Sequence, residues 1–225
     1  MGEQLPGLME AGLDAVNISL DTLEETTFRK ITRRDDFHQV LKGLRAALAY
    51  PSLKVKLNCV PTFQSDEELL QVAALARENS LHVRFIEMMP IGLGKEFTAR
   101  GEEQIKAVLE KEYGLMTPTE EKLGNGPCHY YTLEEFTGRI GFISALSHKF
   151  CDSCNRVRLT STGFLKGCLQ FEDGADLKVL LRSGCSDRML KETIEKVIYE
   201  KPVGHNFQEH KKGNEESHIM AQIGG

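Results

Sequence analysis

The stretch LKVKLNCV, Leu53 to Val60, alternates apolar and polar side chains over most of its length. An extended chain sends successive side chains to opposite faces, so one face is apolar around Leu57 and the other carries Lys56 and Asn58. A parallel strand in an open sheet that is covered on both sides is apolar on both faces. The polar face therefore favours a barrel or partial barrel whose interior is a binding site, although polar side chains that meet water at strand ends would give the same pattern.

Two more strand candidates lie on either side of this segment. AVNISLD, Ala15 to Asp21, turns Ser19 onto a polar face in the same way, and VRFIEMM, Val83 to Met89, has a less regular alternation. Ser65, followed by three acidic residues, is the expected N-cap of a helix. Helical spacing covers the intervening stretches 22–32, 36–50 and 65–79. Strand, helix and strand at this rhythm predict parallel βα units with right-handed crossovers.

The pattern changes in the second half of the chain. After an expected helix over residues 101–113, HYYTLEEFTGRIGFIS predicts two strands around a turn, and RVRLTSTGFLKGCL predicts a hairpin that turns at Gly163. Two helices are expected near residues 176–183 and 186–199. We therefore expect an α/β fold with two domains: a partial barrel of βα units over residues 1–100, and an α+β domain over residues 101–225.

Composition narrows the class of protein. The 225 residues carry a net charge of −5, which argues against a broad nucleic-acid-binding surface but leaves room for a local basic pocket. No apolar run is long enough to span a bilayer and the N-terminus does not have the character of a signal peptide, so we expect a cytoplasmic protein with no membrane partner. Six cysteines in such a chain are better explained as metal ligands or buried thiols than as disulfides. Cys59, Cys128 and Cys185 are isolated and are expected to be small buried side chains.

The segment KFCDSCNRVRLTSTGFLKGCLQF, residues 149–171, concentrates the chemistry of the chain. Cys151 and Cys154 form a CxxC pair that can hold one metal centre, and Cys168 can return across the hairpin as a third ligand. Arg156 and Arg158 are two residues apart, so on a strand both guanidinium groups would face the same side. Because arginine binds phosphate through a planar fork, the pattern predicts a metal or cluster beside a polyphosphate-binding site.

Three other interpretations remain open for this segment. Zinc could bind the three cysteines with His148 or another cysteine as fourth ligand, which would give a closed structural site in a non-catalytic binding module. A redox-active CxxC of the thioredoxin type would open a helix, whereas this one leads into a strand, so we rank that interpretation lower. The two arginines could also pair with surface carboxylates.

Several segments together resemble one family: VNISLDTL, RFIEMMPIG, GRIGFIS, LSHKFCDSCNRVRLT and the terminal IGG. The chain is similar to the molybdenum cofactor biosynthesis protein A family (MoaA), from about residue 5 to the last glycine. That family comprises GTP 3',8-cyclases of the radical S-adenosylmethionine (SAM) class. The resemblance implies a partial TIM-type barrel, then a C-terminal domain with a second 4Fe-4S cluster. It also implies that GTP and SAM give 3',8-cyclo-7,8-dihydro-GTP.

The resemblance assigns roles to individual residues. It implies three thiolate ligands of the second cluster, whose remaining iron position is open to the guanine of GTP: Cys151, Cys154 and Cys168. It implies three cationic contacts to GTP: Lys56, Arg156 and Arg158. It implies two contacts to SAM, Ser19 and Met89, of which Met89 would otherwise be taken for a core residue. It also implies a terminal pair that reaches the active site, Gly224 and Gly225; no catalytic residue is assigned.

One family feature has no counterpart in this sequence. Radical SAM enzymes bind their first cluster through CxxxCxxC, and the one CxxC here is that at Cys151. We therefore expect a C-terminal portion that binds GTP and the second cluster but cannot cleave SAM alone. The resemblance further implies that the product passes to cyclic pyranopterin monophosphate synthase, and it leaves a homodimer open.

Overall fold

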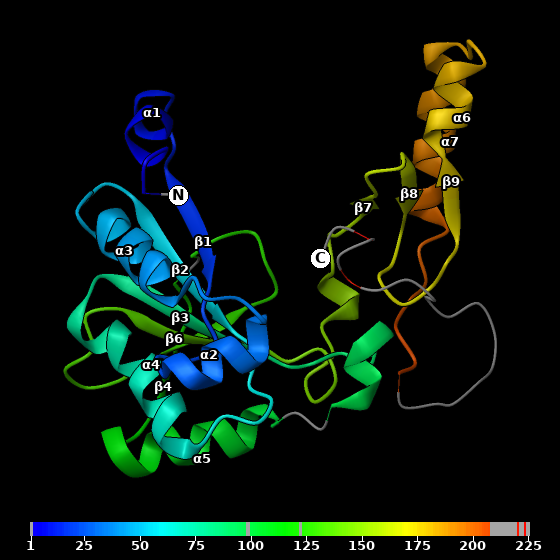
Figure 1. Ribbon diagram of the computed structural model, residues 1–225. Helices are drawn as coiled ribbons and strands as arrows, with labels where there is room; N and C mark the ends of the chain where they lie inside the picture. The colour runs from blue at the N-terminus through cyan, green and yellow to red at the C-terminus, as the bar shows by residue number, and fades with distance from the viewer. Residues whose placement is uncertain (1, 98–99, 122, 208–219, 221–222, 224–225) are drawn as a thin grey trace. The chain divides into compact units, whose positions relative to one another are not determined.

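The computed structural model describes residues 2–97, 100–121, 123–207, 220 and 223 (Figure 1). The chain divides into two compact units, the first built from Met1–Met88 and Thr98–Ser147 and the second from Met89–Phe97 and His148–Gly225. The division after Ser147 differs from the boundary expected near residue 100, because residues 101–147 add a helix and three strands to the first unit. None of the helices within the described residues is long and apolar enough to cross a bilayer.

The first unit is built on a mixed sheet whose strand order is β1-β2-β3-β6-β5-β4. The first four strands in this order are parallel and the last two are antiparallel to their neighbours. Their bounds are β1 (Ala15–Ser19), β2 (Lys54–Cys59), β3 (Leu81–Ile86), β4 (Thr117–Thr119), β5 (His129–Thr132) and β6 (Arg139–Ile143). The predicted parallel βα arrangement is confirmed for β1, β2 and β3, and β5 and β6 are the two strands predicted around a turn.

The first unit contains five helices among its described residues (Figure 1). They are α1 (Leu5–Glu10), α2 (Glu25–Thr32), α3 (Phe37–Leu48), α4 (Asp66–Glu78) and α5 (Glu102–Tyr113). Helices α2 to α5 lie close to the predicted ranges, and α1 had no predicted range. The expected N-cap of α4 is confirmed, because the Ser65 hydroxyl accepts from the Glu68 amide at 3.2 Å and the Glu68 carboxylate accepts from the Ser65 amide at 2.9 Å. This reciprocal pair satisfies two amides that the first helical turn leaves without partners.

The two faces of the first sheet differ in polarity, as the alternation of LKVKLNCV predicts. The apolar positions of β2 are fully buried in a core cluster that also contains α4 residues such as Leu69 and Val72. The alternate positions of β2 face away from that core, with Lys56 and Asn58 half-buried. The same strand therefore stabilises the unit with one face and presents polar groups with the other.

The second unit combines a small antiparallel sheet with two helices (Figure 1). The strands are β7 (Arg158–Leu159), β8 (Phe164–Lys166) and β9 (Gly174–Asp176), and the helices are α6 (Leu177–Arg182) and α7 (Asp187–Tyr199), with short 3-10 turns η1 (Gly92–Glu96) and η2 (Cys151–Ser153). The predicted hairpin around Gly163 is confirmed. Gly163 has φ +86°, and a side chain there would also approach Lys178 Cβ to 2.7 Å. Strand β7 is shorter than expected: it begins at Arg158 and leaves Arg156 outside the strand.

Candidate functional site

The polar face of the first sheet carries two cations at its centre. Lys56 on β2 donates a hydrogen bond to the carbonyl oxygen of Leu123. Burial lowers the pKa of Lys56 below its usual value, and the positive charge of Arg84 lowers it further. The Arg84 guanidinium donates to Asn58 Oδ1 and to Asn17 Oδ1, each at 2.8 Å. Both of these acceptors are neutral amides, so they orient the guanidinium without cancelling its charge.

Close packing beside Arg84 depends on a glycine. Gly141 on β6 lies opposite Arg84 on one side and Tyr130 on the other. A side chain at Gly141 would come within 2.5 Å of Cys128 Sγ and 2.7 Å of the Tyr130 ring, so glycine is required there. Burial raises the pKa of Cys128 to about 11, which keeps this thiol neutral at physiological pH. Cys59 is buried on the opposite, apolar face, as expected for an isolated cysteine.

The two residues that the resemblance links to SAM lie in different units. Ser19 is exposed at the end of β1, opposite Asn58 on β2, on the predicted polar face. Met89 follows β3 and belongs to the second unit, where it is half-buried and its carbonyl oxygen accepts from the Ile91 amide at 2.8 Å. Their contact with SAM stays a prediction. Gly224 and Gly225 lie outside the described residues.

In the second unit the CxxC pair sits on a tight turn. Cys151 and Ser153 bound the 3-10 turn η2, and the Cys154 amide donates to the Cys151 carbonyl at 3.1 Å. The Lys201 ammonium donates to Cys154 Sγ at 3.3 Å, and the His205 amide donates to Cys151 Sγ at 3.5 Å. Two of the three candidate ligands thus receive N–H donors from one short piece of chain that follows α7.

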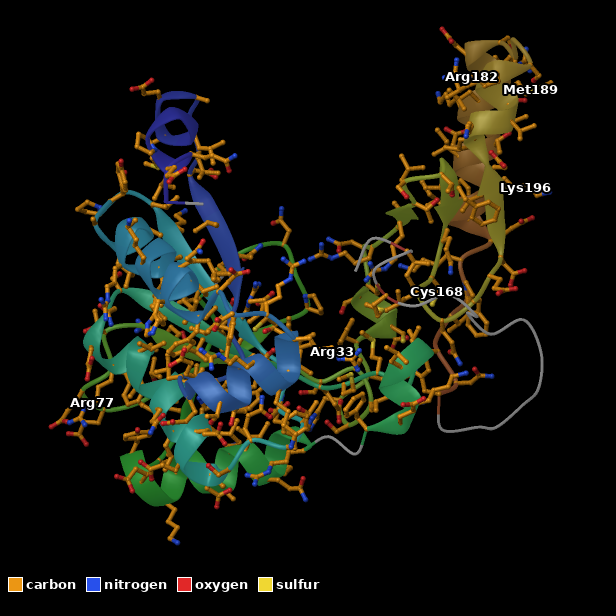
Figure 2. The ribbon with its side chains drawn as sticks, in the orientation of Figure 1. Arg33, Arg77, Cys168, Arg182, Met189 and Lys196 are labelled. Carbon is orange, nitrogen blue, oxygen red and sulfur yellow. The ribbon has the colours of Figure 1, made fainter. Side chains whose placement is uncertain are left out.

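Cys168 lies just after β8 and is labelled in Figure 2. The glycine before it is buried against the end of α7 and a residue just beyond it: a side chain at Gly167 would come within 3.1 Å of the Val197 carbonyl and 3.5 Å of Lys201 Cα. All three candidate cysteines are half-buried free thiols. Residues 201–205 therefore lie close to the CxxC turn, and Lys201 also lies close to the glycine that precedes Cys168.

An iron–sulfur cluster is held by cysteine thiolates that converge on one centre. Within the part of the chain that the structure describes, no three or more Cys, His, Asp or Glu side chains converge closely enough to hold a metal ion. The donor chemistry fits a cluster, because three half-buried thiols lie near one segment and two of them accept N–H hydrogen bonds, which tune cluster sulfurs. His148, the alternative zinc ligand, is exposed.

The two candidate phosphate-binding arginines have different environments. Arg156 is exposed and precedes β7, so only Arg158 lies on the strand that was expected to carry both arginines. Arg158 lies on β7 opposite the buried Lys166 of β8. Burial lowers the pKa of Arg158, and the charge of Arg156 lowers it further, which indicates that the two guanidinium groups are near each other. An anion that bound both would relieve this repulsion.

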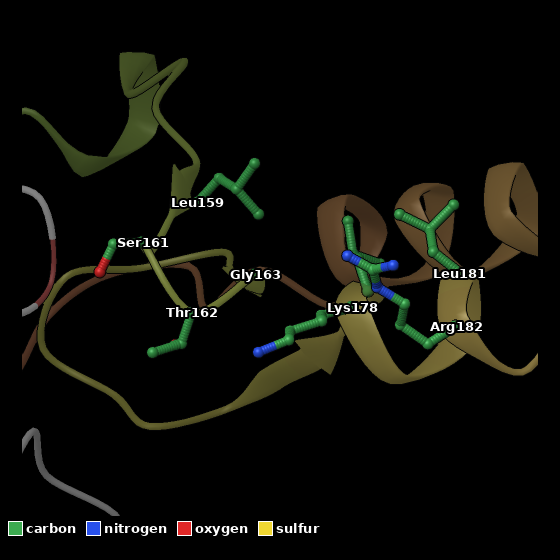
Figure 3. A pocket seen from close by; sticks show the side chains of 8 residues that line it. Leu159, Ser161, Thr162, Gly163, Lys178, Leu181 and Arg182 are labelled. Carbon is green, nitrogen blue, oxygen red and sulfur yellow. The ribbon is translucent and has the colours of Figure 1, made fainter.

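A separate pocket in the second unit contains none of the predicted site residues. It has a volume of about 350 Å³ and lies between the β7–β8 turn and α6. Figure 3 shows Leu159 and Leu181 on its walls, with Lys178 and Arg182 beside them. It is therefore distinct from the cysteine and arginine cluster.

Two residues with evident roles in these arrangements were not identified from the sequence. The alternation of β3 could have placed Arg84 on the polar face with Lys56, had its register been read from Leu81. Lys201 begins the stretch KPVGH, which comes after α7. No local sequence pattern links it to the cysteines, because its contacts arise from tertiary structure.

Comparisons with a family model and with individual known proteins point to the same family. Residues 81–207 match a family model described as Molybdenum Cofactor Synthesis C. The GTP 3',8-cyclase of Clostridium perfringens strain 13 is 43% identical over 227 residues, which cover 100% of this chain and 69% of that protein. The GTP 3',8-cyclases of Syntrophomonas wolfei and Moorella thermoacetica are 41% and 42% identical over 97% of this chain, covering 68% and 67% of their own lengths. The chain therefore belongs to the GTP 3',8-cyclase (MoaA) family of molybdenum cofactor biosynthesis.

Proposed function

We propose that this chain provides GTP recognition in the GTP 3',8-cyclase reaction, in which GTP and SAM yield 3',8-cyclo-7,8-dihydro-GTP. The observation that carries the proposal is the second unit's combination of three half-buried thiols with two adjacent arginines, in a chain of this family. On this proposal the first sheet is part of a TIM-type barrel, and its polar face lines the interior. Residues Ser19 and Met89 are the proposed SAM contacts.

The cations of the chain would neutralise the triphosphate of GTP. Arg156 and Arg158 can each offer a planar pair of donors to phosphate oxygens. Lys56 supplies a compact charge, and its lowered pKa reflects a partly desolvated site with a second cation nearby. A bound phosphate would stabilise the charged form of Lys56 and raise its pKa again. Arg84, already oriented by two amides, would add a further contact without reorganisation.

Cys151, Cys154 and Cys168 would hold the second 4Fe-4S cluster. When bound, the cluster supplies an open iron position that takes the guanine of GTP. The protein's own contribution is to keep the three thiols half-buried and to donate hydrogen bonds to their sulfurs. The rival function, a zinc-stabilised binding module, uses the same thiols without GTP.

The decisive experiment starts with anaerobic purification, assay of iron, sulfide and zinc, and calorimetric titration with GTP. We expect iron and sulfide in near-equal amounts and saturable GTP binding. Arg156→Ala should weaken GTP binding about tenfold or more with iron content unchanged, because one charge-assisted contact is lost. Cys168→Ser should lose the iron, and Arg188→Ala, which changes an exposed arginine on α7, should match the wild type.

Two outcomes would overturn the proposal. Stoichiometric zinc with no GTP binding would favour the binding module, and identical behaviour of Arg156→Ala and Cys168→Ser would show that the two roles are not separate. The same preparation tests the expected limit of the chain. Under reducing conditions residues 1–225 alone should form no 5'-deoxyadenosine from SAM, since no CxxxCxxC is present in them.

A further inference from the structure

A short segment after α7, Lys201 to His205 (KPVGH), lies close in space to the candidate cluster ligands Cys151 and Cys154. Its first residue reaches the CxxC turn through the Lys201 ammonium, and its last donates its amide to Cys151 Sγ at 3.5 Å. Between them, Gly204 lies so close that a side chain there would contact Cys151 Cβ at 3.6 Å. We call residues 201–205 the KPVGH segment.

The Lys201 ammonium has three acceptors within the CxxC region. It donates to Cys154 Sγ at 3.3 Å, to the Cys154 carbonyl at 2.6 Å and to the Arg156 carbonyl at 2.9 Å. An ammonium has three N–H donors, so these acceptors account for all of its hydrogen-bonding capacity. A lysine so placed is fixed against the turn, unlike an exposed lysine whose ammonium stays in water.

Capping of α7 is the ordinary explanation for a lysine just beyond a helix, because such a lysine often binds the last carbonyls of its own helix. Here the three acceptors belong to residues 154 and 156, far away in the sequence. The last turn of α7 is closed by backbone hydrogen bonds instead, from the Glu200 amide to the carbonyls of Ile198 and Lys196. The contacts of Lys201 are thus tertiary, directed at the CxxC turn.

We propose that Lys201 is a positioning residue for the cluster and for the adjacent phosphate-binding arginine. Its ammonium binds the backbone carbonyls on both sides of Asn155, at Cys154 and Arg156. One ammonium therefore fixes the positions of the Cys154 sulfur and the Arg156 backbone. Its hydrogen bond to Cys154 Sγ would favour the reduced, more negatively charged form of a bound cluster and so raise the cluster's reduction potential. This proposal rests on the proposed function for its cluster, but the anchoring of the turn is a property of the chain itself.

The first test measures amide hydrogen exchange by mass spectrometry in the full, reduced, iron-free chain. Lys201→Met removes the charge and keeps the apolar stem. We expect exchange of the peptide covering residues 150–158, which includes the protected Cys154 amide, to rise about tenfold or more, since charge-assisted contacts are lost. Exchange in β2 should be unchanged. Lys196→Met, at an exposed lysine paired with Glu200 on α7, is the matched control and should have no effect.

The second test uses the iron-loaded chain. Lys201→Met should retain less iron under a chelator, and its remaining cluster should have a lower reduction potential than the wild type. Lys201→Arg keeps the positive charge and should restore part of the iron retention and part of the reduction potential. If Lys201→Met unfolds the second unit, the comparison of Lys201→Arg with the wild type still tests the proposal. A chain with Lys201→Met whose exchange at residues 150–158 equals the wild type would overturn the proposal. A wild-type chain without iron but with faster exchange in Lys201→Met would overturn the proposed function and leave the anchoring role intact.

Discussion

Arg84 shows how single side chains prepare the polar face for an anion. Two amides, from Asn17 and Asn58, orient its guanidinium and leave its charge uncompensated by either contact. That charge acts on Lys56, whose pKa is lowered first by burial and then by Arg84. A surface that gathers like charges in this way is stabilised when an anion binds.

Replacing Arg84 should therefore change two measurable quantities. Arg84→Gln should weaken GTP binding about tenfold, because one charged donor is lost. It should also raise the pKa of Lys56 toward its usual value without reaching it, since burial remains, and side-chain NMR of labelled lysine would follow this titration. Arg77→Gln, at an exposed residue of α4, is the control. An unchanged pKa of Lys56 would contradict the assignment.

The capping box of α4 is the clearest case in which an element was predictable in detail. Burial alone would raise the pKa of Glu68, but hydrogen bonds from Ser65, Thr27 and Thr22 outweigh it and hold the pKa below its ordinary value. A carboxylate with a lowered pKa stabilises the folded chain above its unfolded pKa, and this contribution is lost as pH falls through the folded value.

Ser65→Ala should lower the stability of the first unit by about 1 kcal/mol at neutral pH, the usual cost of a lost N-cap. The difference from wild type should shrink as pH falls through the lowered pKa of Glu68, where its carboxylate becomes protonated. Urea unfolding followed at pH 7 and at a series of lower pH values down to the acid limit of the folded chain would measure both. Ser52→Ala, at an exposed position before β2, is the control. A difference that grew on acidification would contradict the assignment.

Elements were predictable where periodicity is long, and less so where tertiary contacts define them. The alternation of β2 gave its polar face and the position of Lys56, and the helices α3 to α5 deviate from their predicted ranges only at their ends. Strand β7 begins only at Arg158, and the Arg156 carbonyl just before it accepts from Lys201, a contact with no local signal in the sequence. Strands β4 and β9 have three residues each, too few for periodicity to show.

At the scale of the molecule, the change of sequence pattern near residue 100 did not mark the division between units. Helix α5 packs on α4, and β6 pairs with β3 in parallel, so residues 101–147 complete the first sheet. Which strands pair across such a distance depends on contacts that the sequence alone does not show. The cysteine and arginine segment can be singled out from the sequence as a group of candidate residues, whereas the KPVGH segment that contacts the CxxC turn cannot.

The two units differ in how many apolar side chains they bury, and this difference gives a prediction for the whole chain. The large core cluster lies in the first unit, while α7 buries none of its residues and α6 buries only Leu177. A unit with little core gains a larger share of its stability from bound metal. Removing iron anaerobically with a chelator should therefore speed amide exchange in β8 and α7 and leave β2 and β3 protected. Cys168→Ser, which should hold no cluster, should already exchange at the faster rate and respond no further. Two results would show that the cluster does not stabilise the second unit: an equal loss of amide protection in both units, or no loss of protection when iron is removed from a chain that had been loaded with it.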